Sequence, residues 1–241
     1  MSERTVDGMR NSLFGKLAVK RDFIALAAPR EFLNVWEPWM QSCVSASRDE
    51  LKEGWLDAYL TAPIWRFWLG SEICGGTVLG ALMSSLDGMG RYYPLTLFTY
   101  ADQSDAIAPP DIDPHDTWFS GAEELLLSTL DKNIAFEEVA SALESFPGPT
   151  RTPNGDTDGH SAARSGILGS GLSAGSFPEL FTALRIAHFS SIYAAATFWW
   201  TVGGGDCEPF GFCCQRMPPP STFAAMLTGR LAPPAEVGDH A

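Results

Sequence analysis

The order of elements is set by residues 64–100, which read IWRFWLGSEICGGTVLGALMSSLDGMGRYYPLTLFTY. Three apolar runs of strand length occur there, at residues 64–69, 77–83 and 92–100. In the first run Arg66 is the only polar residue on either face, so we expect a strand that is covered on both sides. Glycines between Asp87 and Arg91 predict a hairpin joining the second and third runs. Pro94 predicts that the third strand begins at an edge or a bulge.

Helical spacing of apolar residues dominates on both sides of this stretch. Aromatic residues recur every three or four positions between Pro29 and Cys43, and Pro38 within that run predicts a kink or a break. A second helix is expected from Arg48 or Asp49 to Leu60. Further strands are expected at residues 12–18, 195–201 and 209–213, and further helices at 118–130, 135–143, 178–188 and 222–227. The sequence therefore predicts an α/β fold, a single layered domain with a central mixed, partly antiparallel sheet flanked by helices on both faces.

We expect this domain to span residues 11–230. Residues 147–176 are dense in Gly, Pro, Ser, Thr and Asp and have few apolar anchors. Such a segment cannot bury enough apolar surface to offset the entropy of ordering it, so we predict a mobile loop there. Residues 1–10 and 231–241 are expected to be flexible termini.

The composition argues against several classes of function. The formal net charge of −13 leaves no surplus of Lys and Arg to neutralise phosphates, so nucleic acid is not an expected partner. No run of 18 apolar residues occurs, and the first ten residues lack the apolar region of a signal peptide. We therefore expect a cytoplasmic protein that does not insert into membranes.

Metal sites and catalytic motifs are not expected either. The five cysteines are interpreted as reduced structural thiols, since the adjacent Cys213 and Cys214 cannot easily converge on one ion. Serines in the glycine-rich segment 169–176 lack the G-x-S-x-G pattern of a nucleophile elbow. The glycine runs at 75–76 and 203–205 lack the Lys-Ser/Thr of a phosphate-binding loop. We predict no catalytic residue, no metal ligand and no cofactor.

One segment, the hairpin loop from Asp87 to Arg91, contains charged groups that could bind a ligand. Its carboxylate and guanidinium can pair and close the hairpin, or the loop can present a fork to a carboxylate or phosphate group of a ligand. Lys16, Arg21 and Asp22 follow the first strand and could join this cluster. Aromatic residues near Arg66 suit either core packing or a protein–protein contact. The candidate binding residues are Lys16, Asp22, Trp65, Arg66, Asp87, Arg91, Tyr92, Trp199 and Trp200.

Several segments resemble those of one protein family. They are Phe14–Leu17 with Asp22 and Phe23, then Trp36 and Trp39, Trp55–Phe67, Gly80–Thr96, Phe198–Thr201 and Met217–Gly229. In this order they are similar to the TagF/ImpM family, accessory proteins of bacterial type VI secretion systems. The chain departs from the usual family pattern at Arg21, where a glycine is common, and at Ser84–Gly88, where the hairpin opens. If these positions bind something, affinity or partner choice would differ here.

The resemblance implies a regulatory protein rather than an enzyme, one that represses type VI secretion after translation. Members of the family act on a scaffold that carries a forkhead-associated domain, so a protein partner of that kind is expected. No established catalytic residues come with the resemblance. The alternative left open is a small-molecule or phosphoester-binding domain, with or without enzymatic activity, that uses the Asp87–Arg91 loop.

Overall fold

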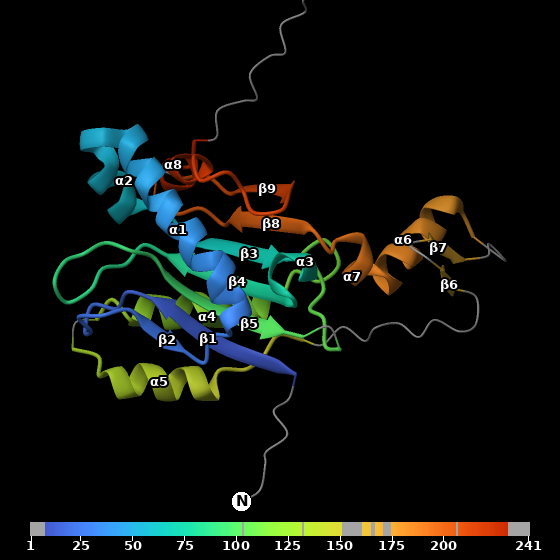
Figure 1. Cartoon of the computed structure of the whole chain (residues 1–241), viewed down its shortest axis with the longest axis horizontal. Coiled ribbons are helices and arrows are strands. Elements are labelled where there is room, and N and C mark those ends of the chain that lie inside the picture. Colours follow the sequence, from blue (N-terminus) through green and yellow to red (C-terminus); the bar gives the residue numbers. More distant parts are fainter. Residues whose placement is uncertain are drawn as a thin grey trace, which may run out of the picture.

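A seven-stranded sheet forms the centre of the protein in a computed structural model of the chain (Figure 1). The structure describes residues 8–102, 104–131, 133–150, 161–164, 167–170, 175–205 and 207–230. In spatial order the strands are β2 (Ile24–Leu26), β1 (Met9–Gly15), β5 (Leu95–Ala101), β4 (Thr77–Met83), β3 (Trp65–Leu69), β8 (Ala196–Thr201) and β9 (Phe210–Gln215). Neighbouring strands are antiparallel at each of the six pairings. The three apolar runs of the central stretch thus form three adjacent strands.

Helices cover both faces of the sheet, which confirms the predicted fold class (Figure 1). One face carries α1 (Arg30–Leu51), α2 (Trp55–Thr61), α3 (Ser71–Cys74) and α8 (Thr222–Thr228). The opposite face carries α4 (Asp116–Ser128) and α5 (Phe136–Ser145). At the right of Figure 1 lie α6 (Phe177–Ala187), α7 (Phe189–Ile192) and a separate hairpin of β6 (Ser161–Arg164) and β7 (Ile167–Ser170).

The sheet has one core cluster on each face because side chains alternate along the strands. Phe67 of β3 lies in the first cluster, where its ring centroid is 4.6 Å from that of Trp36 on α1 and 5.2 Å from that of Trp199. The next residue, Trp68, faces the second cluster, together with Phe119 of α4. This alternation in β3 agrees with the pattern read from residues 64–69.

Helix α1 continues through Pro38, so the prediction of a break was wrong. Proline lacks the backbone N–H that would bond to the carbonyl four residues earlier, which weakens the helix locally. Trp36, Met40 and Cys43 are nevertheless completely buried on one face of α1, and that burial outweighs the missing bond. The helix ends where Lys52 takes a positive φ of 49°, and a short 3₁₀ turn (Lys52–Gly54) leads into α2. The second helix therefore begins later than expected.

Some other boundaries also differ from the sequence-based expectations. β1 begins at Met9, three residues before the predicted start, and β5 begins at Leu95, immediately after Pro94. The segment predicted to be a mobile loop, residues 147–176, contains the paired strands β6 and β7, while its residues 151–160, 165–166 and 171–174 lie outside the described residues. Its mobility stays a prediction. Most of the predicted flexible termini, residues 1–7 and 231–241, also lie outside them.

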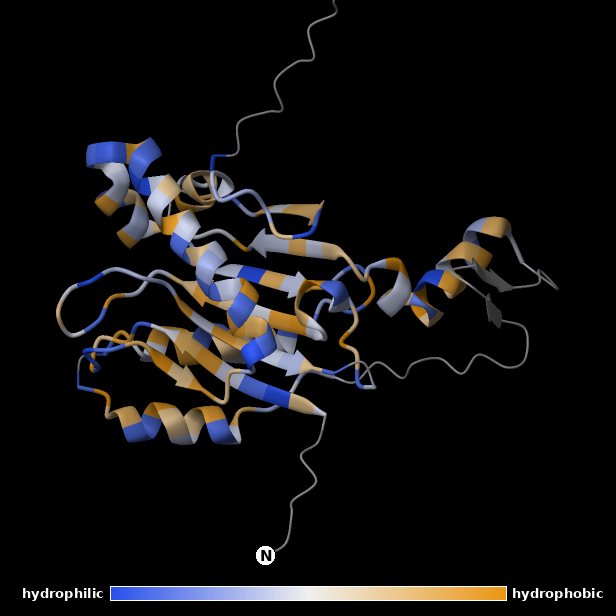
Figure 2. Ribbon diagram, viewed as in Figure 1, coloured by the Kyte–Doolittle hydropathy of each residue, from blue (hydrophilic) through white to orange (hydrophobic). Residues whose placement is uncertain are grey.

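Helix α6 stands apart from the core. None of its residues is buried, and Figure 2 shows apolar residues along it. Arg185 of α6 forms an ion pair with Asp111, with the Nη1–Oδ2 distance 2.6 Å, which anchors the helix to the segment before α4. Among the described residues, no helix combines the length and the apolar character needed to cross a membrane.

Candidate functional site

The carboxylate of Asp87 is the centre of a buried polar cluster. It is fully buried, and each of its oxygens accepts two hydrogen bonds. Oδ2 accepts from Lys16 Nζ at 2.8 Å and from Arg91 Nε at 2.7 Å. Oδ1 accepts from the backbone N–H groups of Met89 and Arg91, both at 3.0 Å. Asp87 therefore holds both the loop that contains it and the loop after β1.

The backbone of the loop explains why its glycines are needed. Asp87 donates its N–H to the carbonyl of Arg91 at 3.1 Å, and Gly90, with φ of +77°, donates to the carbonyl of Asp87 at 2.9 Å. Gly88 donates to the carbonyl of Lys20 at 2.7 Å, and a Cβ at Gly88 would lie 3.1 Å from the carbonyl oxygen of Ala18. A side chain at residue 88 would push the two loops apart.

A second layer of hydrogen bonds connects these loops to α2. Tyr59 of α2 donates its hydroxyl to the carbonyl of Ser85 at 2.9 Å and accepts the N–H of Ser85 at 3.1 Å. The hydroxyl of Ser85 donates to the carbonyl of Lys16 at 2.8 Å. Burial raises the pKa of the Tyr59 phenol, so its hydroxyl stays protonated and remains a donor.

The electrostatics of the cluster keep Asp87 ionised. Burial by itself would raise the pKa of its carboxyl, but the hydrogen bonds from Lys16, Arg91 and Met89 outweigh burial and hold the pKa well below its usual range. A carboxylate in this state has no free lone-pair direction for a ligand and does not exchange protons near neutral pH. The geometry thus corresponds to the ion pair that closes the hairpin, the first of the two alternatives for this loop.

The outer side of the same loops is exposed. The Arg91 side chain is 59% exposed, and its Nη2 also donates to the carbonyl of Arg21. Met89 is 64% exposed and Phe23 is 46% exposed, and the Phe23 ring lies edge-on to that of Tyr93 with centroids 4.8 Å apart. We call the exposed residues Arg21, Asp22, Phe23, Met89 and Arg91 the loop patch.

Three of the other candidate residues belong to the interior and lie away from this cluster. Trp65 and Trp199 are buried in the first core cluster, where their indole N–H groups donate to the carbonyl of Met226 and the hydroxyl of Thr197, each at 2.9 Å. Arg66 lies on the opposite face of the sheet. Its Nε donates to Glu123 Oε1 at 2.6 Å.

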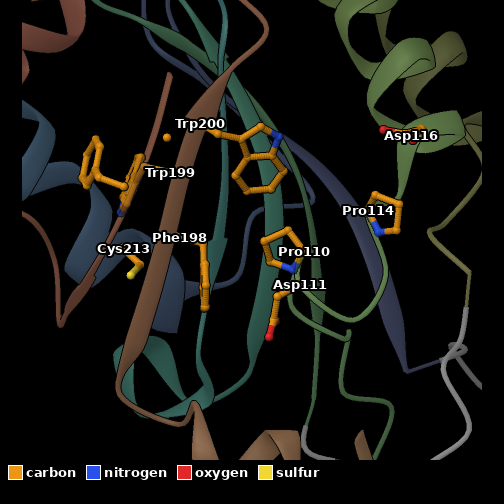
Figure 3. Close-up of a pocket in the computed structure, with 10 residues that line it drawn as sticks. Pro110, Asp111, Pro114, Asp116, Phe198, Trp199, Trp200 and Cys213 are labelled. Atoms are coloured by element: carbon orange, nitrogen blue, oxygen red, sulfur yellow. The ribbon is translucent and has the colours of Figure 1, made fainter. Parts of the chain in front are cut away.

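Tyr92 and Trp200 are half-buried and occupy two further places. Tyr92 lies next to the cluster, with its ring edge-on to that of Tyr59 at 5.6 Å. Trp200 lines a pocket of about 490 Å³ beside β8 and β9, shown in Figure 3. The structure thus brings Lys16, Asp87 and Arg91 into contact, with Tyr92 next to them and Asp22 in the loop patch. Trp65, Arg66, Trp199 and Trp200 lie elsewhere.

Sequence reasoning missed Phe23 and Met89 of the loop patch, as well as Pro110, Pro114 and Phe198 of the pocket. Phe23 directly follows Asp22, and Met89 lies inside the Asp87–Arg91 loop, so their places in the sequence were the available signal. Among the described residues, no three His, Cys, Asp or Glu side chains are grouped as metal ligands.

Comparisons with known proteins identify the family. The family model described as "TagF N-terminal domain, Type VI secretion system-associated" matches residues 12–146, which include both loops of the Asp87 cluster. A crystal structure of PA0076 from Pseudomonas aeruginosa PAO1 is similar, with 32% sequence identity and a TM-score of 0.76 over 92% of this chain and 96% of that chain. A search of curated proteins found no significant match. From the extent of the family match, this chain belongs to the TagF N-terminal domain family, which is associated with type VI secretion.

Proposed function

We propose that this protein is a cytoplasmic regulator that represses type VI secretion after translation by binding a scaffold component of the secretion system. Membership of the TagF N-terminal domain family supports the link to type VI secretion. The observation that supports the binding role is that both carboxylate oxygens of Asp87 have their full number of hydrogen bonds. Because its four hydrogen bonds fix both loops, the loop patch is a pre-organised surface whose exposed side chains are available to a partner.

The composition of the loop patch suits a protein partner. Arginine, methionine and aromatic residues are enriched in protein–protein interfaces, and arginine is prominent among the residues that contribute most binding energy. Arg91 and Met89 combine these properties on one loop, beside Phe23. The partner we propose is a scaffold with a forkhead-associated domain, the class implied by the family resemblance.

A catalytic role for this loop has less support. General acid–base chemistry needs a group that can exchange a proton with substrate, whereas Asp87 is buried and fully hydrogen-bonded. Arg91 alone could still contact an anion, but a guanidinium is not an acid or base near neutral pH. We therefore favour a binding protein over an enzyme.

The proposal is tested by a secretion assay with charge reversal in the loop patch. Deletion of the gene should raise secretion of a type VI effector, and overproduction should suppress it. Arg91→Glu, produced at the same level, should lose this suppression. The matched control is Arg10→Glu, because Arg10 is exposed near the other end of β1. Secretion that responds to neither deletion nor overproduction would refute the repressor role, and full repression by Arg91→Glu would refute the loop patch as the binding surface.

A further inference from the structure

Strand β9 forms an open edge of the sheet. It pairs with β8 on one side, and no described strand pairs with it on the other. An edge strand presents unpaired N–H and C=O groups that can accept a further strand by main-chain hydrogen bonding. This edge lies at the opposite side of the sheet from β1 and β2, so it is separate from the loop patch (Figure 1).

A pocket adjoins this edge because large residues on β8 lie opposite small ones on β9. The register pairs Trp200 with Gly211 and Phe198 with Cys213. The large residues of β9 belong to the other face, where Phe212 packs with its ring centroid 5.8 Å from that of Trp65. The rings of Phe198 and Trp200 are therefore left partly uncovered on the α4 face of the sheet.

The wall opposite these two rings comes from the segment before α4. Pro110 and Pro114 complete an apolar pocket of about 490 Å³, and Figure 3 shows Phe198, Trp200 and Pro110 on the same side of β8. Adjacent strands are about 4.8 Å apart, so a large side chain on a strand added to β9 can reach over Gly211 into this space.

The rim of the pocket is acidic. Asp116 lines it with a side chain that is 79% exposed. The cation closest to it is Arg66, 3.9 Å away, which already pairs with Glu123 at 2.6 Å. The other rim carboxylate, Asp111, is occupied by Arg185 at 2.6 Å and by the hydroxyl of Tyr193 at 2.8 Å. Asp116 is thus the carboxylate that a basic residue of a partner would complement.

We propose that β9 binds an extended segment of a partner protein, which joins the sheet as an eighth strand. One aromatic or long aliphatic side chain of the segment lies against Phe198 and Trp200, and a lysine or arginine two residues away, on the same face of the added strand, pairs with Asp116. The acidic chain, with a net charge of −13, also attracts a basic segment over longer distances. The loop patch takes no part in this contact, so the two surfaces can be tested separately.

The test selects peptides for dependence on the pocket. A phage library of random dodecapeptides is panned on the immobilised full chain after depletion on the Cys213→Trp variant. Cys213 is exposed, so the new indole fills the pocket without crowding the core. The matched control is Gln215→Trp, which carries the same group on the same face of β9 but outside the pocket lining. Thermal melts of both variants establish that they fold.

Recovered peptides should carry an apolar side chain and, two positions away on the same face of the strand, a basic one. By fluorescence anisotropy they should bind the native chain and Gln215→Trp equally, and Cys213→Trp at least ten-fold more weakly. Asp116→Lys, a second variant that changes the rim but leaves the apolar wall of the pocket intact, should weaken binding up to about five-fold, the range of an exposed ion pair. In an added strand, every second backbone N–H of the peptide points toward β9. Methylating these nitrogens should abolish binding, whereas methylating the other nitrogens should leave binding unchanged.

Three results would overturn the proposal. The first is a library that yields no peptide dependent on the pocket. The second is binding that survives methylation of either set of peptide nitrogens, since a strand pairs through its backbone. The third is dimer formation by the native chain, measured by light scattering, that the Cys213→Trp substitution disrupts. A second copy of this chain would then occupy the edge.

Discussion

At the scale of single residues, the two cations that contact Asp87 differ in burial. Lys16 is 6% exposed, whereas the Arg91 side chain is 59% exposed. Removing a partner of a buried charge is costly because the remaining charge stays desolvated, while an exposed ion pair contributes little. The two contacts therefore differ in their effect on stability although their lengths are nearly the same, 2.8 and 2.7 Å.

Lys16→Met should lower the free energy of unfolding by about 2–3 kcal/mol, since Asp87 would keep only Arg91 and two backbone donors. Arg91→Ala should lower it by no more than about 1 kcal/mol. Urea titrations of both variants and of the native protein measure the difference. Equal losses, or a larger loss for Arg91→Ala, would contradict the assignment of Lys16 as the principal partner.

The depressed pKa of Asp87 predicts how stability depends on pH. A carboxyl with a lower pKa in the folded state contributes stability above its unfolded pKa, about 4, and loses it as the pH falls through the folded pKa. Asp87→Asn should be less stable than the native protein at pH 7, by about 3 kcal/mol. The difference should shrink steadily below pH 4. Melting temperatures of both proteins between pH 7 and pH 3 measure it, and a constant difference would contradict this linkage.

At the scale of elements, Pro38 can be assessed directly because its side chain is exposed on α1. Replacement by alanine restores a backbone donor and removes a ring that crowds the preceding turn, without changing the buried face. Pro38→Ala should therefore raise the free energy of unfolding by about 1–3 kcal/mol. Gln41→Ala, also exposed on α1, is the control and should change it by less than about 0.5 kcal/mol. A destabilised Pro38→Ala would mean that the proline fits a bend that the helix needs.

Elements with a strong local signal were predictable from the sequence. β4 occupies residues 77–83 as expected, because its apolar run is bounded by Gly76 and by polar Ser84. Residues whose secondary structure depends on partners far away in the sequence were not predictable. The start of β1 contains Arg10 and Asn11, and two adjacent polar residues do not predict a strand. The strand forms there because it pairs with β5, about 90 positions away in the sequence.

The candidate site shows the same division. Asp87 and Arg91 are four residues apart on a glycine loop, so their pairing could be predicted. Lys16 was expected only as a residue that could join this cluster, because its contact with Asp87 spans 71 positions and depends on the order of strands β1, β5 and β4. Phe23 and Met89 are apolar residues that a sequence pattern assigns to the core by default. Their exposure follows from the geometry of two loops that only the folded sheet brings together.

At the scale of the whole molecule, the two core clusters share one sheet. Within β3 the buried residues Phe67 and Trp68 are consecutive, yet they belong to different clusters on opposite faces. Both clusters pack on the same strands. If either cluster were lost, one face of these strands would be exposed and the packing of the other cluster would be weakened. The described core should therefore unfold as one cooperative unit.

One substitution on each face tests this coupling. Trp36→Leu removes a buried ring from the α1 face, and Phe119→Leu removes one from the α4 face. Each should lower the free energy of unfolding by about 2–4 kcal/mol, within the range for truncating buried aromatic residues. In both variants tryptophan fluorescence and far-ultraviolet circular dichroism should report one coincident transition, because the shared strands lose their packing on both faces at once. If Phe119→Leu instead produced two separate transitions, with only part of the fluorescence change in the first, the α4 face would be an independently unfolding layer.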